Sequence, residues 1–314
     1  MFKSLPLFYF PTTICWLDDD KLFLEAADNL FKEKFNSIFF DNPHKAYKFL
    51  SSYETSLPKN NFIKSLSEND IYDKQDHYPV DINIGKISQL SEKPHRRDEI
   101  SILIIDNNMP DIKGIDICRQ LSGSPYKKIL LTGETEANEI INAFNQGIID
   151  KFVSKDQDII DNLQKCIVEL NNKFFYSQTE NLLPDIETSK LTPLADPIFI
   201  DFFYNWCNSN KIEEFYLINK NGSFLVKDKN GNKTYFIVMS EKAIKDFIKL
   251  NDDALDKAGK MLEEISIGNK IPFFGVRKES WEFDYAEWEK YLYPAQIIEG
   301  REMYYWATIQ NGNN

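Results

Sequence analysis

Short apolar runs alternate with segments of helical periodicity through the first half of the chain. The runs lack polar alternation, which is typical of strands buried on both faces of a parallel sheet. They lie at residues 13–17, 37–40, 102–105, 128–131 and 150–154. Apolar residues at helical spacing follow them at residues 22–35, 43–53, 115–121, 137–146 and 159–175. This alternation predicts a doubly wound α/β domain with five parallel strands and right-handed crossovers.

Two polar segments break this rhythm. Residues 55–98 are rich in Ser, Asn, Lys and Asp and show weak periodicity. An unstructured loop of that length would be unusual in a compact domain, so we predict an insertion before the third strand that folds in part, around residues 78–90. The second segment, residues 176–197, carries three prolines and is predicted to be a linker.

The second half of the chain changes from α/β alternation to hairpins. An aromatic-rich helix is predicted at 198–207, and the β-rich runs after it lie at 215–218, 224–227 and 234–238. Asn221-Gly222 and Asn230-Gly231 separate these runs and are strong two-residue turn signals. The later predicted elements are a helix at 241–265 and strands at 273–276 and 303–309. The aromatic spacing in residues 281–292 fits either a strand or one face of a helix.

These patterns divide the chain into three parts. We expect a doubly wound domain over residues 1–175 that contains the insertion, then the linker. Residues 198–314 are expected to form an α+β domain with an antiparallel sheet. A length of 314 residues agrees with two domains of ordinary size.

Composition narrows the classes of function. The 49 acidic residues outnumber 37 basic ones, so the formal net charge is −12. Nucleic-acid binding needs a basic surface, and this balance does not support it. No apolar run reaches the ~18 residues of a membrane span, and the N-terminal segment lacks the cleavage site of a signal peptide. The four scattered cysteines show no metal-ligand or disulfide pattern, so we expect a reduced, cytoplasmic protein without a membrane anchor.

Polar residues follow four of the predicted strands at their carboxyl ends. They are the run Asp18-Asp19-Asp20, Asp106, Thr132 and Lys155. In a parallel sheet these ends share one edge, where ligands and chemistry collect. Clustered carboxylates suit Mg²⁺, which also binds phosphate oxygens. Asp106 is then a candidate nucleophile for a phosphoryl group, with Lys155 and the metal neutralising charge and the Thr132 hydroxyl donating a hydrogen bond.

The same residues resemble the receiver domain of two-component response regulators, which has a flavodoxin-like fold. The motif Asp-x-x-Met-Pro-x-x-x-Gly corresponds to Asp106, Met109, Pro110 and Gly114. The acidic pair corresponds to Asp18 and Asp19, the hydroxyl to Thr132 and the lysine to Lys155. The resemblance covers residues 12–170 apart from the insertion.

The resemblance implies roles for these residues. Asp106 is the phosphoacceptor, and Mg²⁺ is bound by Asp18, Asp19, Asp106 and the backbone carbonyl of Asn108. Phe152, three positions before the lysine, is the switch aromatic. Two positions depart from the family pattern: Gly133 replaces the usual alanine, and Asp156 replaces the proline that usually follows the lysine. We expect Gly133 to loosen the loop over the phosphoryl group, and Asp156 to shift Lys155 or to pair with it.

The resemblance also implies partners. A sensor histidine kinase would donate the phosphoryl group, and a homodimer is expected. The only chemistry expected is self-phosphorylation and autodephosphorylation at the receiver aspartate, so the protein is not otherwise an enzyme. The layout, with its insertion before the third strand, is similar to proteobacterial response regulators of the Legionella quorum-sensing type, whose C-terminal half is unclassified.

Two alternatives stay open. Haloacid-dehalogenase-like phosphatases also place Asp-x-Asp, Thr and Lys at strand ends, and Asp18 would then be the nucleophile. That reading needs a further acidic pair, for which Asp156 and Asp158 are poorly placed, and it leaves Asp106 without a role. In the other alternative the C-terminal half binds a ligand or a protein, and the receiver is a phosphate sink or a dimer switch.

Overall fold

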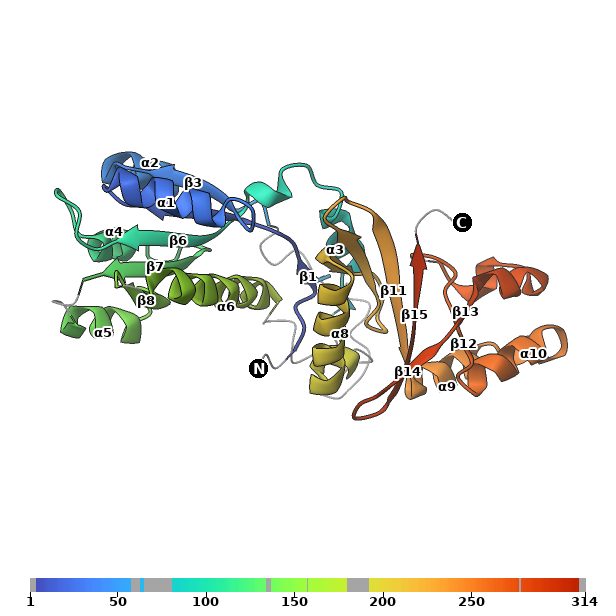
Figure 1. Cartoon of the computed structure of the whole chain (residues 1–314). Coiled ribbons are helices and arrows are strands. Elements are labelled where there is room, and N and C mark those ends of the chain that lie inside the picture. Colours follow the sequence, from blue (N-terminus) through green and yellow to red (C-terminus); the bar gives the residue numbers. More distant parts are fainter. Residues whose placement is uncertain are drawn as a thin grey trace, which may run out of the picture. The chain divides into compact units, whose positions relative to one another are not determined.

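The chain divides into two compact units. The computed structural model describes residues 4–57, 63–64, 81–133, 137–156, 158–179, 192–276 and 278–310. The parallel-sheet unit comprises residues 10–59 and 94–178. The antiparallel-sheet unit comprises residues 1–9, 60–93 and 179–314. Each unit has its own sheet and its own helices (Figure 1).

The parallel-sheet unit has the predicted doubly wound fold. Its strands lie in the order β3-β2-β6-β7-β8, and all neighbours are parallel. The strands are β2 (Thr13–Leu17), β3 (Asn36–Phe40), β6 (Ile100–Asp106), β7 (Lys127–Thr132) and β8 (Lys151–Ser154). The helices are α1 (Lys21–Phe31), α2 (Pro43–Ser51), α4 (Gly114–Gln120), α5 (Ala137–Asn145) and α6 (Ile159–Thr179). This is the strand order of flavodoxin-like folds, which confirms the predicted fold class.

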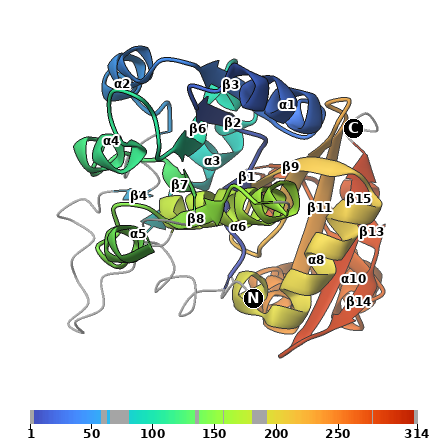
Figure 2. The same cartoon turned by 60° about the vertical axis from the view of Figure 1, so that its left-hand side comes forward.

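Helices cover both faces of this sheet. Helices α1 and α6 pack on one face around Trp16, Ile104 and Leu131, and α2, α4 and α5 pack on the other around Leu103, Ile105 and Leu130. Figure 2 shows the two groups of helices on opposite sides of the sheet. Burial on both faces explains why β6 reads as an uninterrupted apolar run.

Local signals set the ends of the helices. Asp20 caps α1, because its carboxylate accepts hydrogen bonds from the amides of Leu22 (2.9 Å) and Phe23 (3.3 Å). Asn42 caps α2 in the same way, and Pro43 occupies the first helical position. Helix α6 continues to Thr179, so it extends four residues beyond its predicted end at 175 and into the predicted linker. Most of that linker lies outside the described residues.

The antiparallel-sheet unit is built on a six-stranded sheet with the order β1-β9-β10-β11-β15-β14. The predicted meander forms its centre as β9 (Ile212–Leu217), β10 (Phe224–Asp228) and β11 (Lys233–Ser240). Strands β15 (Met303–Gln310) and β14 (Gln296–Glu299) follow on one side. On the other side, β1 (Phe8–Tyr9) pairs with β9, so the sheet takes one edge strand from the start of the chain.

An aromatic layer covers one face of this sheet. Helix α8 (Pro197–Ser209) places Phe199, Phe203 and Trp206 against ring side chains of the strands. The ring of Phe203 lies 4.8 Å from that of Phe224 and 5.2 Å from that of Phe236. The other face packs on α9 (Glu241–Leu250) and α10 (Leu255–Ser266). The aromatic spacing of the predicted helix at 198–207 therefore reflects core packing.

Two predictions for this unit were wrong. The single helix predicted at 241–265 is broken into α9 and α10 by a 3₁₀ turn, Asp252–Ala254. Residues 273–276 form no strand: the Phe273 amide still donates to the Tyr291 carbonyl (2.8 Å), but the pairing ends there, and Gly275 has a φ of +118°. Instead, β12 (Lys270–Pro272) pairs with β13 (Leu292–Pro294). The stretch 281–292, for which the sequence left a strand and a helical face open, forms two 3₁₀ helices, Ser280–Glu282 and Tyr285–Tyr291. They bury Trp288 and leave Trp281 69% exposed.

Residues 63–64 and 81–93 of the insertion belong to the antiparallel-sheet unit, whereas its described ends, 55–57 and 94–98, are grouped with the parallel-sheet unit. The insertion contains the short pair β4 (Ile63–Lys64) and β5 (Asp81–Ile82) and the helix α3 (Ile84–Leu90). Helix α3 packs against β9, and the Lys227 ammonium donates a hydrogen bond to the Ser91 carbonyl just after α3 (2.5 Å). The predicted folding around 78–90 thus holds for residues 81–90, and residues 78–80 lie outside the described residues. Residues 1–9 and 60–93, assigned from the sequence to the first domain, are grouped with the second unit.

No helix in the described ranges is both long enough and apolar enough to cross a lipid bilayer. The four cysteines, predicted to be reduced, are all free.

Candidate functional site

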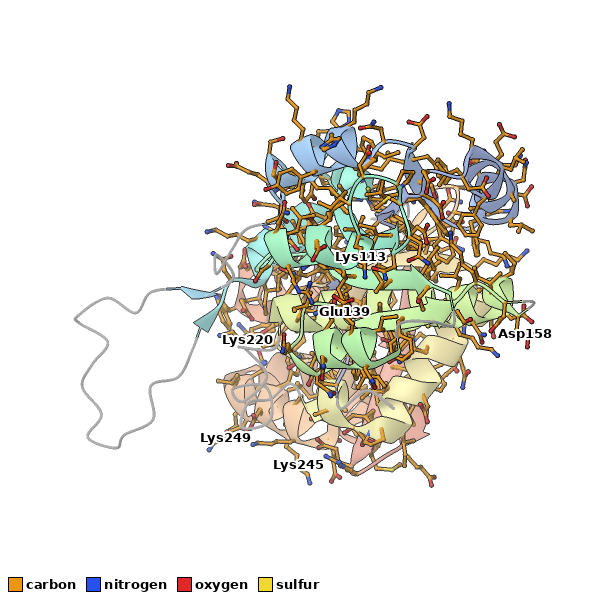
Figure 3. The ribbon with its side chains drawn as sticks, turned by 90° about the vertical axis from the view of Figure 1, so that its left-hand side faces the viewer. Lys113, Glu139, Asp158, Lys220, Lys245 and Lys249 are labelled. Atoms are coloured by element: carbon orange, nitrogen blue, oxygen red, sulfur yellow. The ribbon has the colours of Figure 1, made fainter. Side chains whose placement is uncertain are left out.

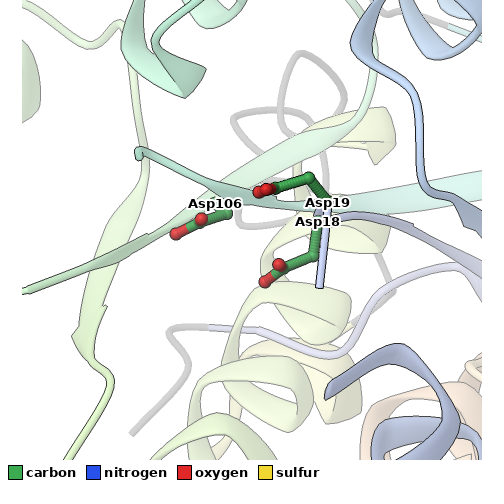
Figure 4. A group of neighbouring side chains, drawn as sticks. All are labelled: Asp18, Asp19 and Asp106. Atoms are coloured by element: carbon green, nitrogen blue, oxygen red, sulfur yellow. The ribbon is translucent and has the colours of Figure 1, made fainter. Parts of the chain in front are cut away.

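Three carboxylates meet at the carboxyl edge of the parallel sheet. Oxygen atoms of Asp18, Asp19 and Asp106 all lie within 4.8 Å of one another. Figure 4 shows Asp18 and Asp19 reaching toward Asp106 from the neighbouring strand end. Asp18 and Asp106 are buried, whereas Asp19 is exposed. The predicted convergence of residues almost 90 positions apart is therefore present in the fold.

The register of the strands produces this convergence. Leu17 in β2 pairs with Ile105 in β6, so the next residues, Asp18 and Asp106, emerge side by side. On the other side of β6, β7 and β8 end level with each other, since Thr132 pairs with Ser154. Lys155 follows directly, and its amide donates a hydrogen bond to the Thr132 carbonyl (2.9 Å). Parallel pairing thus brings all four predicted strand ends to one site.

The ammonium group of Lys155 joins two of the acids. It lies 2.8 Å from Oδ2 of Asp18 and 3.0 Å from Oδ1 of Asp106. Burial lowers the pKa of Lys155, but its hydrogen bonds with Asp18 and Asp106 outweigh that effect, and the net pKa is raised. The net pKa of Asp18 is also raised, because burial raises it more than Lys155 lowers it.

The geometry of the acids suits a small divalent cation. An octahedral Mg²⁺ holds oxygen ligands at about 2.1 Å, so ligands on opposite sides are about 4.2 Å apart. The 4.8 Å limit for the three carboxylates is close to this span, and small side-chain rotations would close the difference. Asp18, Asp19 and Asp106 are therefore the residues that would hold Mg²⁺, and the Asn108 carbonyl follows two positions after Asp106 in the chain.

The hydroxyl and the aromatic residue predicted for the site lie near its rim. Thr132 is buried at the end of β7, and its hydroxyl donates to the carbonyl of Gly133 (2.8 Å). It must rotate before it can donate to a group on Asp106. Phe152 is 45% exposed in β8, and its ring contacts that of Phe144 edge-on at 6.3 Å. Its side chain is accordingly at the surface formed with α5.

The loop after Asp106 is held by residues that sequence reasoning did not select. Asn107 is fully buried, and its side-chain oxygen accepts from the amide of Ile115 (3.1 Å), which fixes the start of α4. Lys113 forms a backbone bridge with Asn108, and its ammonium lies 3.3 Å from Glu139 of α5 (Figure 3). The available signal for Asn107 was its place directly after the reactive acid, in the loop that leads to Met109-Pro110.

The two departures from the family pattern have local explanations. Asp156 does not pair with Lys155, contrary to one of the two expectations. Its carboxylate instead accepts a hydrogen bond from the amide of Asp158 (3.0 Å), just before α6. Gly133 leaves space, because among the described residues a β-carbon there would come within 4 Å only of the side-chain amide nitrogen of Asn108, at 3.7 Å. Asp20, which has no role in the family pattern, is the cap of α1.

Comparison with known families identifies the unit. Residues 74–167 match the response regulator receiver domain family. The chain carries a response regulator receiver domain. The matched range contains Asp106, Thr132 and Lys155, while the acidic pair lies before it and is brought to the site by β2. The match overrides the phosphatase alternative, which leaves Asp106 without a role.

A solved structure matches both units. The Legionella pneumophila response regulator LqsR is 27% identical, with a TM-score of 0.79, over 99% of this chain and 91% of that one. This likeness confirms the predicted similarity to the Legionella type of response regulator and extends through the antiparallel-sheet unit.

Other matches are partial. An adenylate cyclase structure from Rhodopirellula baltica is 15% identical over 55% of this chain and 98% of that one, with a TM-score of 0.37. A response regulator from Thermotoga maritima is 17% identical over 51% of this chain and 98% of that one, with a TM-score of 0.33. No curated protein matches the chain.

Proposed function

We propose that the protein is a response regulator that accepts a phosphoryl group on Asp106 from a sensor histidine kinase. The observation that carries the proposal is the joint placement of two further carboxylates, Asp18 and Asp19, and one ammonium around Asp106. In the transfer, a carboxylate oxygen of Asp106 forms a bond to phosphorus. The bond from phosphorus to the histidine nitrogen breaks, and the imidazole leaves.

Each neighbour of Asp106 has a task in this transfer. Mg²⁺, when bound by the three carboxylates, would neutralise charge on the phosphoryl oxygens. Lys155 already contacts Asp106, so its ammonium can follow the charge onto the phosphoryl group. The Thr132 hydroxyl would leave the Gly133 carbonyl and donate to a phosphoryl oxygen. No further enzymatic activity is expected of the chain beyond loss of the phosphoryl group by hydrolysis.

The signal would leave the receiver domain through the surface next to Thr132. A cavity of about 530 Å³ there is lined by Thr132, Ile140, Phe152 and neighbouring residues of β8 and α6. Rotation of Thr132 toward the phosphoryl group opens space beside it, and Phe152 can turn inward from its exposed position. Such a change alters the surface of α5, β8 and α6, and we propose that it favours a homodimer.

The antiparallel-sheet unit is proposed as the output, acting through a protein, a small ligand or a second copy rather than through nucleic acid. The excess of acidic over basic residues in the whole chain supports this choice. A cytoplasmic location with reduced cysteines is part of the proposal, in keeping with four free cysteines. The likeness to LqsR supports a role in quorum sensing.

The proposal is tested with acetyl phosphate as a small phosphoryl donor. Purified protein with Mg²⁺ should gain one phosphoryl group in intact-mass spectra, and peptide mapping should place it on Asp106. Asp106→Asn should gain none, while Asp156→Asn, an acid outside the cluster, should behave as wild type. A phosphoryl group on Asp18 would instead contradict the proposal.

A second measurement separates a switch from a phosphate sink. The mass in solution is compared for wild type and Asp106→Asn, each with and without beryllofluoride. A shift toward dimer in the wild type alone supports the switch. An unchanged mass together with unchanged partner binding would leave the receiver domain as a phosphate sink.

A further inference from the structure

The ammonium of Lys155 has a third neighbour besides the two acids. Its nitrogen lies over the ring of Phe23, 5.0 Å from the ring centre. That distance is within the range in which an aromatic face attracts a cation. Phe23 is half-buried in the first turn of α1, and its ring packs against the core between the sheet and helices α1 and α6. The ring is therefore held in place independently of the lysine.

The backbone of Phe23 is tied to the acidic pair. Its amide donates to the carboxylate of Asp20 (3.3 Å), and the amide of Asp20 donates to Oδ1 of Asp18 (3.0 Å). Since Asp18 also accepts from Lys155, the contacts form a closed circuit through Asp18, Asp20, Phe23 and Lys155. A displacement of the ring would therefore shift both the Lys155 ammonium and the Asp18 carboxylate.

The backbone of Lys155 is bonded to Thr132, but its side chain has little restraint of its own. The following residue is Asp156, which has no ring to fix its φ, and the Lys155 side chain is a flexible stem that is 28% exposed. Its direction must come from the groups that surround the ammonium. Two of these are the carboxylates, which the lysine has to exchange for phosphoryl oxygens during transfer.

We propose that Phe23 is a positioning residue that keeps the Lys155 ammonium beside Asp106 while its carboxylate partners change. The inference rests on the proposed phosphoryl transfer to Asp106. When Mg²⁺ binds Asp18, that carboxylate can no longer be the main partner of the lysine. The ring face then remains as a neighbour that neither Mg²⁺ nor the phosphoryl group displaces, so the ammonium stays within reach of the incoming charge.

The test compares Phe23→Leu, which removes the aromatic face at similar volume, with Phe23→Tyr, which keeps it. Leu22→Ala is the matched control, because Leu22 directly precedes Phe23 on α1 and is 77% exposed. Acetyl phosphate serves as the donor, so kinase docking plays no part. Phe23→Leu should be phosphorylated about three- to tenfold more slowly. Phe23→Tyr and Leu22→Ala should keep the wild-type rate.

Magnesium binding separates positioning from structural damage. Isothermal titration should give Phe23→Leu a Mg²⁺ affinity equal to or above that of wild type, because a loosened lysine competes less for Asp18. Beryllofluoride, as a phosphoryl mimic, should bind Phe23→Leu more weakly. A wild-type phosphorylation rate in Phe23→Leu overturns the proposal. A parallel loss of Mg²⁺ binding and rate in Phe23→Leu, with no rescue in Phe23→Tyr, overturns it as well.

A readout without phosphorus distinguishes this inference from the proposed function. Reductive methylation with formaldehyde labels lysines, and mass spectrometry reports the rate at each site. Lys155 should be labelled slowly in wild type and Phe23→Tyr, and several-fold faster in Phe23→Leu. If wild type takes no phosphoryl group but this labelling pattern appears, the proposed function fails and the positioning stands. Equal labelling in all three proteins overturns the positioning.

Discussion

The α-carbon of Gly114 lies against the backbone of Asp106. A β-carbon at Gly114 would come within 2.1 Å of the Asp106 carbonyl oxygen and 2.9 Å of its carbonyl carbon. The amide of Gly114 also donates to the carbonyl of Asn107 (3.2 Å), which closes the loop after β6. The glycine in the Met-Pro-x-x-x-Gly motif is therefore required by the approach of two backbone segments beside the phosphoacceptor.

Gly114→Ala is expected to destabilise the receiver domain and to displace Asp106. Because the atoms in the way are backbone, the clash cannot be relieved by a side-chain rotation, and we expect a loss of about 2 kcal/mol or more. Urea denaturation gives the free energy of unfolding, and acetyl phosphate gives the phosphorylation rate, which should fall. A variant as stable as wild type would show that the loop can move aside.

Gly133→Ala is the matched glycine substitution on the other side of the site. Its β-carbon would make only an ordinary contact with the Asn108 side chain, at 3.7 Å, and its φ is not positive. Alanine reduces the conformational freedom of the unfolded chain, so the free energy of unfolding should rise by about 0.4–1 kcal/mol. A loss of stability in the same urea experiment would contradict this description of the loop.

Magnesium affinity should depend on pH through Asp18. Its pKa is raised by burial, and the protonated acid cannot bind the ion, so affinity should begin to fall at a higher pH than for an ordinary aspartate. Titration calorimetry from about pH 4, near the ordinary pKa of aspartate, to about pH 8 checks this. Asp18→Asn should bind Mg²⁺ weakly throughout, with a flatter pH dependence.

The same raised pKa has a consequence for stability without Mg²⁺. The folded protein holds the Asp18 proton more tightly than the unfolded chain, so this group makes unfolding easier as the pH rises past the ordinary aspartate value. The contribution should be absent in Asp18→Asn. Thermal unfolding of both proteins across the acid range measures the difference, and identical profiles would exclude a role for Asp18.

Lys155→Met removes the ammonium from two buried carboxylates. Asp18 and Asp106 would then face each other without a counter-charge, and we expect a loss of about 2 kcal/mol in metal-free buffer. Mg²⁺ should restore part of this stability, because it binds the folded state only. Lys151→Met is the control, since its pair with Glu169 (3.0 Å) is partly exposed and should contribute under about 1 kcal/mol.

The antiparallel-sheet unit should not fold from the C-terminal half alone. A chain that starts at residue 192 lacks β1 and α3, which both pack on β9, and it loses the buried side chains of Leu5, Leu7 and Phe8. Without them the edge of β9 is open to other chains. We expect weak near-ultraviolet circular dichroism and non-cooperative unfolding. A synthetic peptide of residues 4–10 should improve both, and cooperative unfolding without it would contradict the assignment.

Lys227→Met tests the attachment of the insertion in the full chain. Lys227 is buried and donates to the Ser91 carbonyl after α3, so its loss should weaken the docking of α3 while the sheet persists. Hydrogen exchange should become faster in residues 84–90 and stay unchanged in β11. Lys229→Met, in the exposed turn between β10 and β11, is the control and should leave both segments unchanged.

Much of the receiver domain is predictable from the sequence because its signals are local. An apolar run buried on both sides, such as 102–105, specifies a central strand, and an acid at its end specifies the edge where it emerges. The predicted range 13–17 coincides with β2, and the motif from Asp106 to Gly114 marks the loop. Parallel topology then requires the acids, Thr132 and Lys155 to meet, before any coordinate is known.

The antiparallel-sheet unit was less predictable because its boundaries depend on distant partners. Phe8–Tyr9 is a strand of two residues between prolines, and nothing in its own pattern says that it pairs with Phe215 and Tyr216. The turn between α9 and α10, Asp252–Ala254, contains no Gly or Pro, and its Ala254 is buried in one cluster with the distant Trp288.

By itself the sequence determined the order of elements in the receiver domain, the acids that cluster and the residue that accepts phosphorus in our proposal. Tertiary structure alone decided that residues 1–9 and 60–93 belong to the second unit and that Phe23 lies beside Lys155. The physical reason is range. Periodicity and turn chemistry act over a few residues, whereas an edge strand, a docked helix or a ring above an ammonium exists only when separate segments come together.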